Sequence, residues 1–406
     1  MVETAGRSGP LAGMRVIELA HIMAGPVCGL MLADMGAEVI KVEKMDGDDT
    51  RRTVPPALEG ESAAYMMMNR GKRGLSLDLK NPDGVAVLRR LLGTADALIE
   101  NYRGGTMERL GIGYETLRQE FPALVYCSLS GFGRTGPYAD RAGFDLVAQG
   151  MSGLMSVTGE GPGRPPMKCG PPVTDITAGI LAAMGVLAAY THRLKTGRGQ
   201  AVDTSLFEAG ITHTYWQSAI AMATGIAPGP MGSAHPLNAP YEAFETADGW
   251  ITIGAANQTN WLRMLKAVDA EALAEDPRFA LNRDRMANRH ALAATLAPIF
   301  SAETSEVWLA RLEAGGVPAG PVLDVNAMHQ DPQTLAREMV VEVEHSRVGR
   351  MKTLGLPVKF SDTPGRVHGP APLLGEHSRA ILAEAGYTAA EIDGLIDRGV
   401  VRETAA

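Results

Sequence analysis

An α/β fold with a mostly parallel sheet is predicted by two features of the sequence. First, short β-rich runs alternate with helical patterns through the first half of the chain, beginning with "RVIELA" (15–20), an apolar segment through "CGLMLADMG", and "AEVIKVE" (37–43). This βαβ rhythm is typical of parallel strands joined by crossover helices. Second, a helix start signal falls between strands, with Asn81 as the cap and Pro82 at the first helical position. We therefore expect helices on both faces of the sheet.

The same rhythm continues along the chain. Further strands are expected at "GLSLDL" (74–79), "DALIEN" (96–101), "LVYCSLSGFG" (124–133) and "GQAVDTSL" (199–206). Helices are expected around "NPDGVAVLRRLLGTA" and "YETLRQEF", and over a long apolar stretch that begins near Asp175.

The length of the chain predicts two domains, because 406 residues exceed the usual size of one hydrophobic core. Gly and Pro crowd together in "ATGIAPGPMGSAHPLNAP", which is typical of a linker. Beyond it, two strands flank Ala247-Asp248-Gly249 as in a hairpin, and helices are expected at "NWLRMLKAV", "RDRMANRHALAATLAPIF" and "EVWLARLEAG". We expect a Rossmann-like large domain over 1–222, a linker over 223–240, a smaller α+β domain over 241–328, and a C-terminal part, 329–406, that returns to the large domain.

Composition excludes several classes of protein. The net charge of −8 argues against a dedicated nucleic-acid binder, and 45% apolar with 21% charged residues is typical of a soluble globular chain. Cys28, Cys127 and Cys169 show no CxxC spacing, which favours reduced thiols. The start, "MVETAGRSGPLAGM", lacks an apolar core of signal-peptide length, so we expect no export and a cytoplasmic location.

Common cofactor motifs are absent from the sequence. After the first strand the chain reads "HIMAGPVCG", where only Gly25 and Gly29 are available for a GxGxxG pattern, so NAD is not expected. There is no GxxxxGK[ST] phosphate loop and no GxSxG elbow, since "GMSGLMS" has the wrong spacing. Without HExxH or paired histidines, no metal site is expected.

One carboxylate, Asp175, stands between a proline pair and fifteen uncharged residues in "GPPVTDITAGILAAMGVLAAY" (170–190). The pattern predicts a buried helix that begins near Asp175, ends at Gly197, and is too short to span a bilayer. Thr174 or Asp175 is expected to cap this helix. An acid at a helix N-terminus is also held ionised, and a carboxylate is a nucleophile for acyl groups, so a catalytic role is compatible with the cap.

Basic residues cluster at the ends of the predicted strands. They are Lys41 and Lys44, the run "NRGKRG" (69–74), and Arg103 and Arg109. Ligands of such sheets bind outside the carboxyl ends of the strands, so these cations could hold a polyphosphate; the alternative is a solvated rim.

Several segments, in order along nearly the whole chain, resemble the class III coenzyme A transferases, the superfamily of formyl-CoA and carnitine CoA transferases and methylacyl-CoA racemases. The segments are "GMRVIELAHIMAGPVCGLMLADMGAEVIKVE" (13–43), "NRGKRGLSLDLK" (69–80), "ADALIENYRGGTMERLG" (95–111), "PPVTDITAG" (171–179), "KTGRGQAVDTSL" (195–206) and "APLLGEHS" (371–378).

The resemblance places the catalytic carboxylate on Asp175. In this family the aspartate attacks an acyl-CoA thioester, which gives a mixed anhydride and then an aspartyl-CoA thioester, and an acceptor acid reverses the sequence. The implied CoA contacts are His21, Met23, Ala24, Lys44, Leu77, Lys80, Asn101, Tyr102, Arg103, Arg109, Arg141 and Asp145. Where some relatives carry an arginine, Lys44 keeps the charge without the bidentate fork.

Further expectations rest on the same resemblance. A glycine-rich active-site loop matches "GPMGSAHP", with Gly232, Ser233, Ala234 and His235 as the substrate-loop residues. Coenzyme A and acyl-CoA are implied as substrates, with no tightly bound cofactor and no metal. The implied partners are small carboxylic acids, with a dicarboxylate such as succinate as donor or acceptor, and a second copy of the chain in an interlocked homodimer. Neither a nucleic acid nor a membrane is expected.

Two alternatives stay open from the sequence. The racemases carry a histidine immediately before the aspartate in the segment that matches "RAGFD", where this chain has Phe144, and a phenyl ring cannot move a proton. A 2-methylacyl-CoA racemase is therefore the less favoured reading. A non-catalytic acyl-CoA binding protein is the other alternative, and the intact Asp175 argues against it.

Overall fold

The computed structural model describes residues 6–404, and the chain divides into two compact units. Unit 1 comprises residues 1–152, 169–213 and 331–406, and unit 2 comprises residues 153–168 and 214–330. The expected boundary at 222 differs from this division, because residues 214–222 belong to unit 2 together with the short segment 153–168. Residues 153–168 lie in the sequence between two strands of unit 1, and a sequence pattern does not reveal that such a segment packs with another unit.

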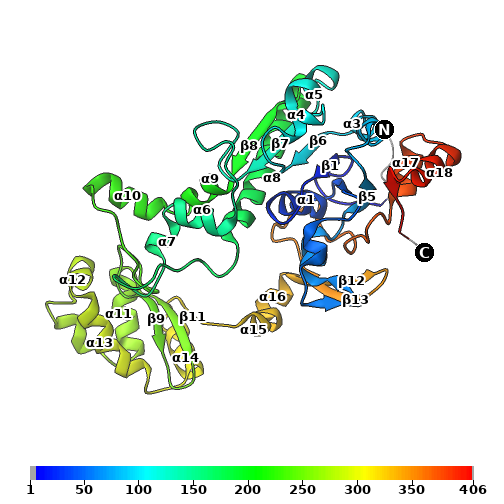
Figure 1. Cartoon of the computed structure of the whole chain (residues 1–406). Helices are drawn as coiled ribbons and strands as arrows, with labels where there is room; N and C mark the ends of the chain where they lie inside the picture. Colours follow the sequence, from blue (N-terminus) through cyan, green and yellow to red (C-terminus); the bar gives the residue numbers. More distant parts are fainter. Residues whose placement is uncertain (1–5, 405–406) are drawn as a thin grey trace. The chain divides into compact units, whose positions relative to one another are not determined.

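Unit 1 is built on a seven-stranded sheet with the order β14-β5-β2-β1-β6-β7-β8. Figure 1 labels β1, β5, β6, β7 and β8 of this sheet. Its six parallel strands are β1 (Arg15–Leu19), β2 (Glu38–Glu43), β5 (Arg73–Leu77), β6 (Ala97–Glu100), β7 (Val125–Ser130) and β8 (Ala201–Ser205). The short β14 (Val401–Arg402) pairs antiparallel with β5 at one edge. Numbered along the chain, the parallel strands lie in the order 3-2-1-4-5-6, which is the Rossmann order with its switch point between β1 and β6. The prediction of an α/β fold with a mostly parallel sheet is confirmed.

Both faces of this sheet are covered, because successive side chains of each strand point to opposite faces. In β1, Val16 packs with α1 (Ala24–Asp34) and α8 (Val173–Thr196), whereas its neighbour Ile17 packs into a second core. That second core is formed with α3 (Pro82–Leu92), α5 (Tyr114–Glu120), α17 (Ser378–Glu384) and α18 (Ala389–Asp397). The predicted start of α3 is confirmed, since Asn81 accepts a hydrogen bond from the Asp83 N–H at 3.0 Å and Pro82 follows it.

The longest helix, α8, lies against α1, β7, β8 and α9 (Leu206–Thr212). At Gly179 a Cβ atom would lie 2.6 Å from the carbonyl oxygen of Ala24, and at Gly185 it would lie 2.6 Å from Val202, so small residues allow this close packing. The expectation that the helix is too short for a bilayer is wrong: it has 24 residues and meets the length and composition of a membrane span. The polar residues of its last two turns continue the helix to Gly197, which has a left-handed φ of 73°.

Smaller elements complete unit 1. The hairpin of β12 (Val340–His345) and β13 (Gly349–Leu354) follows α16 (Pro332–Ala336), and β3 (Ala57–Leu58) pairs with β4 (Glu61–Ser62). Short helices lie between strands: the 3-10 helix η1 (Asp49–Arg52), α2 (Ala63–Asn69), α4 (Thr106–Arg109) and α6 (Asp145–Met151).

Unit 2 is a small α+β domain around its own core. The predicted hairpin is confirmed as β9 (Tyr241–Glu245) and β10 (Trp250–Gly254), and β11 (Ala319–Pro321) pairs with β10. Its helices are α7 (Leu154–Val157), α10 (Tyr215–Thr224), α11 (Gln258–Ala267), η2 (Glu271–Glu275), α12 (Asn282–Ala287), α13 (Arg289–Phe300), α14 (Ser305–Ala314) and α15 (Val325–Gln330). The single helix expected over 283–300 is two helices that meet at Asn288, whose side-chain N–H donates to the Asp284 carbonyl at 2.9 Å.

Candidate active site

A cleft of about 520 Å³ opens at the switch point of the sheet, entirely within unit 1. Its walls come from the turns that follow β1, β6 and β7, and from the first turn of α8. In open α/β sheets the loops at a switch point diverge to opposite faces and leave a crevice there, which is where ligands bind. Eight of the expected site residues line the cleft: His21, Met23, Ala24, Asn101, Tyr102, Arg103, Arg141 and Asp175.

The carboxylate of Asp175 lies in this cleft without a hydrogen-bond donor among residues 6–404. The side chain is half-buried, and burial, followed by the negative charge of Asp145, raises the pKa of Asp175 to about 7. The expected cap is wrong, because α8 has no side-chain cap and Asp175 lies inside its first turn. The expectation that the helix N-terminus holds the acid ionised is also wrong: removal of water from the carboxylate raises its pKa, and no neighbouring donor offsets this.

The first turn of α8 is anchored by Asp145, the first residue of α6. One carboxylate oxygen of Asp145 accepts hydrogen bonds from the Thr174 N–H at 3.0 Å and the Thr174 hydroxyl at 2.7 Å. The other oxygen accepts from the Gln149 side-chain N–H at 2.7 Å. Asp145 was expected to contact CoA, but it is not among the residues that line the cleft. In the structure it holds the residue next to Asp175.

The turn after β1 is held by Asn101, which follows β6. The side chain of Asn101 accepts a hydrogen bond from the His21 N–H at 2.9 Å and donates one to the His21 carbonyl at 2.8 Å. The His21 ring packs against Tyr102 with ring centroids 5.5 Å apart. Burial lowers the pKa of His21, so its imidazole is neutral near pH 7. Two strands that are adjacent in the sheet thus build one rigid wall of the cleft.

Two arginines of the cleft have no carboxylate within ion-pair distance among residues 6–404. They are Arg103 and Arg141, both exposed, and the guanidinium carbon of Arg141 lies 3.9 Å from the centre of the Tyr138 ring. Their charge is therefore available to a phosphate or carboxylate ligand.

Sequence reasoning missed Arg134, which also lines the cleft. Its guanidinium donates to both carboxylate oxygens of Glu100, at 2.7 and 3.0 Å, and to the Tyr102 carbonyl at 2.9 Å. It thereby joins the ends of β6 and β7. The glycine-rich run after β7, "SGFGRTG", is a signal that could have directed attention to this turn.

Besides Asp145, four expected CoA contacts lie outside this cleft. Lys44 lines a neighbouring hollow of about 120 Å³ that includes His21 and Tyr102, and its ammonium group lies 3.0 Å from Asp49. Lys80 is exposed, and Arg109 is exposed and donates to the Thr106 hydroxyl at 2.9 Å. Leu77 is buried in β5 opposite Val401.

The expected substrate loop belongs to unit 2. There the Gly232 N–H donates to the Gly159 carbonyl at 2.8 Å, and the Ser233 hydroxyl accepts from the Ala243 N–H at 3.0 Å. The ring of His235 lies between Trp216 and Tyr241, with ring centroids 5.9 and 5.1 Å away. This loop is thus tied to the body of its own unit.

A metal centre finds no support in the part of the chain that the structure describes, where no group of three or more histidine, cysteine, aspartate or glutamate side chains could hold an ion. The polar side chains of the cleft are arginines, an amide, an imidazole, carboxylates and hydroxyls. Such groups suit binding of an anionic organic ligand and nucleophilic attack by a carboxylate.

The fold is therefore a Rossmann-type α/β fold, and the site is a switch-point cleft that contains a carboxylate. Comparison with known proteins identifies the family. CoA-transferase family III matches residues 11–378, so the chain belongs to this family and is a class III CoA transferase. It is similar to succinate–glutarate CoA-transferase of Agrobacterium fabrum, with 42% identity over 95% of this chain and 98% of that protein. It is similar to succinyl-CoA:mesaconate CoA-transferase of Haloarcula marismortui, with 40% identity over 93% of this chain and 97% of that protein.

Solved structures agree with this assignment. A CAIB/BAIF family protein from Brucella suis is 40% identical, with a TM-score of 0.84, over 93% of this chain and 100% of that one. Rv3272 from Mycobacterium tuberculosis is 29% identical, with a TM-score of 0.82, over the same share of each chain. The resemblance read from the sequence segments is confirmed at the level of the family.

Proposed function

We propose that this enzyme transfers CoA between succinyl-CoA and a second dicarboxylate, with Asp175 as the nucleophile. The observation that carries the proposal is the Asp175 carboxylate, half-buried in the cleft without a hydrogen-bond donor among the described residues. Relatives named for succinate with glutarate and for succinyl-CoA with mesaconate support the choice of substrates.

In this mechanism one oxygen of Asp175 attacks the thioester carbonyl of succinyl-CoA. The carbon–sulfur bond breaks, CoA leaves as its thiolate, and an aspartyl–succinyl anhydride remains. The thiolate then attacks the aspartyl carbonyl, which releases succinate and forms an aspartyl-CoA thioester. An acceptor carboxylate attacks this thioester, its carbon–sulfur bond breaks, and CoA thiolate leaves behind an aspartyl–acceptor anhydride. The thiolate finally attacks the acceptor acyl carbonyl, which forms the acceptor's CoA ester and releases the carboxylate of Asp175. Each thioester is exchanged for another, so no external energy source is required.

The environment of Asp175 suits this chemistry. A carboxylate with a pKa near 7 is more basic, and hence more nucleophilic, than one with the ordinary aspartate pKa of 3.8. Partial burial also keeps water away from a hydrolysable anhydride. We propose Gly232, Ser233, Ala234 and His235 as substrate-loop residues, because they match the active-site loop of the family and His235 carries an imidazole that suits an acceptor carboxylate.

The proposed CoA site follows the cleft. His21, Met23, Ala24, Asn101 and Tyr102 form the wall for the pantetheine and adenine groups. The exposed arginines Arg103 and Arg141 supply charge for the phosphates, and Lys44, Lys80 and Arg109 are proposed as further contacts at the exposed edge.

We further propose that the enzyme works as an interlocked homodimer in the cytoplasm. Support for a second copy comes from exposed apolar side chains on α6 and α8, where Leu146 is 54% exposed and Met184 is 61% exposed. Soluble monomers rarely expose such neighbouring apolar groups without a partner. A mass measurement in native solution at micromolar concentration is expected to give twice the chain mass, and a monomeric mass would contradict the dimer.

The proposed nucleophile is tested by mass spectrometry of the intact protein after mixing with succinyl-CoA. We expect an adduct on Asp175 that hydroxylamine converts to a hydroxamate, and no adduct in Asp175→Asn. Asp140→Asn removes another carboxylate that lines the same cleft and is expected to keep the adduct. An adduct in Asp175→Asn, or its loss in both variants, would contradict the assignment.

The proposed substrates are tested with a panel of carboxylic acids. With succinyl-CoA as donor, new thioesters of glutarate and mesaconate are expected at higher kcat/KM than those of acetate or butyrate. Equal rates with the monocarboxylates would contradict the dicarboxylate assignment and leave the CoA transferase class intact.

A further inference from the structure

The turn after β1 contains a backbone conformation that its residue disfavours. Ile22 has a φ of 67°, in the left-handed region, where β-branched side chains are genuine outliers. The residue lies between His21 and Met23 in the wall of the cleft. Strained residues of this kind persist only when surrounding contacts hold them, and they cluster at functional sites.

The contact that holds Ile22 comes from Asp48. The Ile22 N–H donates a hydrogen bond to Oδ1 of Asp48 at 3.1 Å, and the same oxygen accepts from the N–H and the hydroxyl of Thr50 at 3.0 and 2.9 Å. Asp48 follows β2, so this bond ties the end of β2 to the turn after β1. Asn101 ties the same turn to β6 through both backbone groups of His21.

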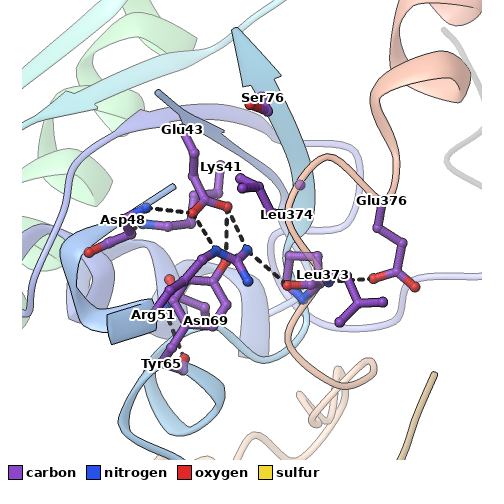
Figure 2. Close-up of polar contacts among 12 residues, drawn as sticks. Lys41, Glu43, Asp48, Arg51, Tyr65, Asn69, Ser76, Leu373, Leu374 and Glu376 are labelled. Carbon is purple, nitrogen blue, oxygen red and sulfur yellow. Dashed lines mark hydrogen bonds and ion pairs between the residues drawn. The ribbon is translucent and has the colours of Figure 1, made fainter. Parts of the chain in front are cut away.

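Asp48 is itself fixed from two sides. Its Oδ2 atom lies 2.9 Å from the ammonium group of Lys41, and both side chains are buried, with exposed fractions of 0% for Lys41 and 1% for Asp48. Its backbone N–H donates to Glu43 at 2.9 Å, and Arg51 and Tyr65 in turn hold Glu43 (Figure 2). The carboxylate therefore has one available position.

Lys41 is part of a buried network with balanced charge. Its ammonium group donates to Glu18 at 3.1 Å and to the Ala20 carbonyl at 2.9 Å, and Lys72 lies 2.8 Å from the other oxygen of Glu18. The network thus contains two carboxylates, Glu18 and Asp48, and two ammonium groups. Burial alone would lower the pKa of Lys41, but the neighbouring carboxylates outweigh it and raise this pKa. Burial alone would raise the pKa of Asp48, but the charge of Lys41 and the hydrogen bonds that Asp48 accepts outweigh it and lower this pKa.

Ion pairs this deeply buried are seldom the most stabilising way to fill a core, whereas they fix geometry well. We propose that Asp48, held by Lys41, is a positioning residue that sets the left-handed turn at Ile22 and thereby pre-forms the His21–Ala24 wall for acyl-CoA. This inference rests on the proposed function. It assigns the pair to binding of the CoA thioester and leaves the covalent steps to Asp175.

Two paired variants separate the positioning role from the ion pair. Lys41→Met/Asp48→Asn removes both charges and keeps an amide oxygen that accepts from the Ile22 N–H, and Lys72 still balances Glu18. Lys41→Met/Asp48→Leu removes both charges and the acceptor. By calorimetry with CoA alone, we expect the Kd of the Leu variant to rise about tenfold and that of the Asn variant to stay within about threefold of wild type. In turnover, the Leu variant should show a raised KM for succinyl-CoA with a much smaller change in kcat.

A second substitution that restores CoA affinity to the Leu variant would separate the positioning role from a general loss of stability. Glycine adopts positive φ without strain, so Ile22→Gly in the Leu variant is expected to recover part of the lost affinity. The matched control is the buried pair of Asp34 with Arg70, joined at 2.6 Å at the opposite end of α1, ten residues and about 15 Å along the helix from Ala24. Arg70 lies in the run 69–74 that was considered for a polyphosphate, but its side chain is 3% exposed and is not among the residues that line the cleft. Asp34→Asn/Arg70→Met is expected to change the melting temperature and leave the Kd for CoA unchanged.

The inference is overturned if the Asn and Leu variants bind CoA equally well, or if the Asp34 control weakens CoA as much as the Leu variant does. If neither paired variant folds, hydrogen exchange of the wild-type Ile22 amide decides: strong protection is expected, and exchange at the rate of an unbonded loop amide overturns the proposal. A wild-type protein that binds CoA but forms no Asp175 adduct would instead contradict the proposed function alone.

Discussion

The carboxylate of Asp145 accepts two hydrogen bonds from Thr174, one from the backbone N–H at 3.0 Å and one from the hydroxyl at 2.7 Å. This double contact fixes the first turn of α8 one residue before Asp175. The same negative charge contributes to the raised pKa of Asp175. One residue therefore both places the proposed nucleophile and makes it more basic, and the following predictions separate these effects.

Transfer activity is expected to depend on pH through Asp175. Burial and Asp145 raise the pKa of Asp175 to about 7, and only the ionised carboxylate attacks a thioester. Consequently kcat/KM for succinyl-CoA should rise about tenfold per pH unit below 7 and level off above it. Initial rates between pH 5.5 and 9 provide the measurement. A profile that is flat from pH 5.5 to 8 would contradict this account of the site.

Asp145→Asn is expected to move that profile to lower pH. The amide keeps an oxygen that accepts from Thr174 but removes the charge that opposes ionisation of Asp175. Burial is the larger cause of the raised pKa of Asp175. The substitution should therefore lower this pKa by only part of the difference between about 7 and the ordinary 3.8. The control is Asp140→Asn, whose carboxylate is not among the causes of the shift. A shift to higher pH in Asp145→Asn would disprove the electrostatic argument.

Replacement of the proposed nucleophile is expected to stabilise the fold at high pH. The folded-state pKa of about 7 lies above the ordinary aspartate pKa of 3.8, which applies to the unfolded chain. The folded protein therefore binds more protons than the unfolded chain between these two pH values, and stability falls as pH rises through this window. Above pH 7 the full penalty applies. Asp175→Asn should raise the free energy of unfolding by about 2–4 kcal/mol at pH 8 and change it little near pH 4. Urea unfolding at both values tests this, and equal effects at both would contradict it.

Gly179→Ala is expected to destabilise unit 1. The added Cβ would lie 2.6 Å from the Ala24 carbonyl and 2.7 Å from the Cβ of Val27, so α8 and α1 must separate. Overpacking of this kind costs about 1–3 kcal/mol. Gly394→Ala in α18 is the matched control, because its Cβ would meet only the flexible end of Arg398 and alanine favours a helix. Thermal unfolding should show a lower melting temperature for the first variant and an equal or higher one for the control.

Much of the fold could be predicted because parallel strands buried on both faces have local signatures. The six parallel strands were each predicted to within a few residues, and the cap at Asn81 followed from the side chains around it. The order of the strands was not predicted, since pairing of β1 with β6 joins residues about eighty positions apart and leaves no periodic trace in either segment. The split between α12 and α13 was missed because the helical pattern runs through Asn288 without interruption.

The residues of the candidate site also divide into those that could be predicted from local sequence and those that could not. Asp175, His21, Met23, Ala24, Asn101, Tyr102, Arg103 and Arg141 were found from ordered family segments, and all of them line one cleft. Arg134 was missed, because its bonds to Glu100 and Tyr102 exist only once β6 and β7 are paired. Asp145 was predicted to contact CoA, because the sequence does not reveal that its carboxylate oxygens accept hydrogen bonds from Thr174 and Gln149.

By itself the sequence determined the α/β class, the family, and the lone carboxylate at the start of an apolar helix, because composition, periodicity and ordered motifs are local properties of the chain. Only the tertiary structure decided the protonation of Asp175 and the shape of the wall opposite it. A pKa depends on the water that folding removes and on charges brought near from distant segments, as Asp145 is to Asp175 and Asp48 is to Ile22. These are effects of proximity in space, which the order of residues along the chain does not specify.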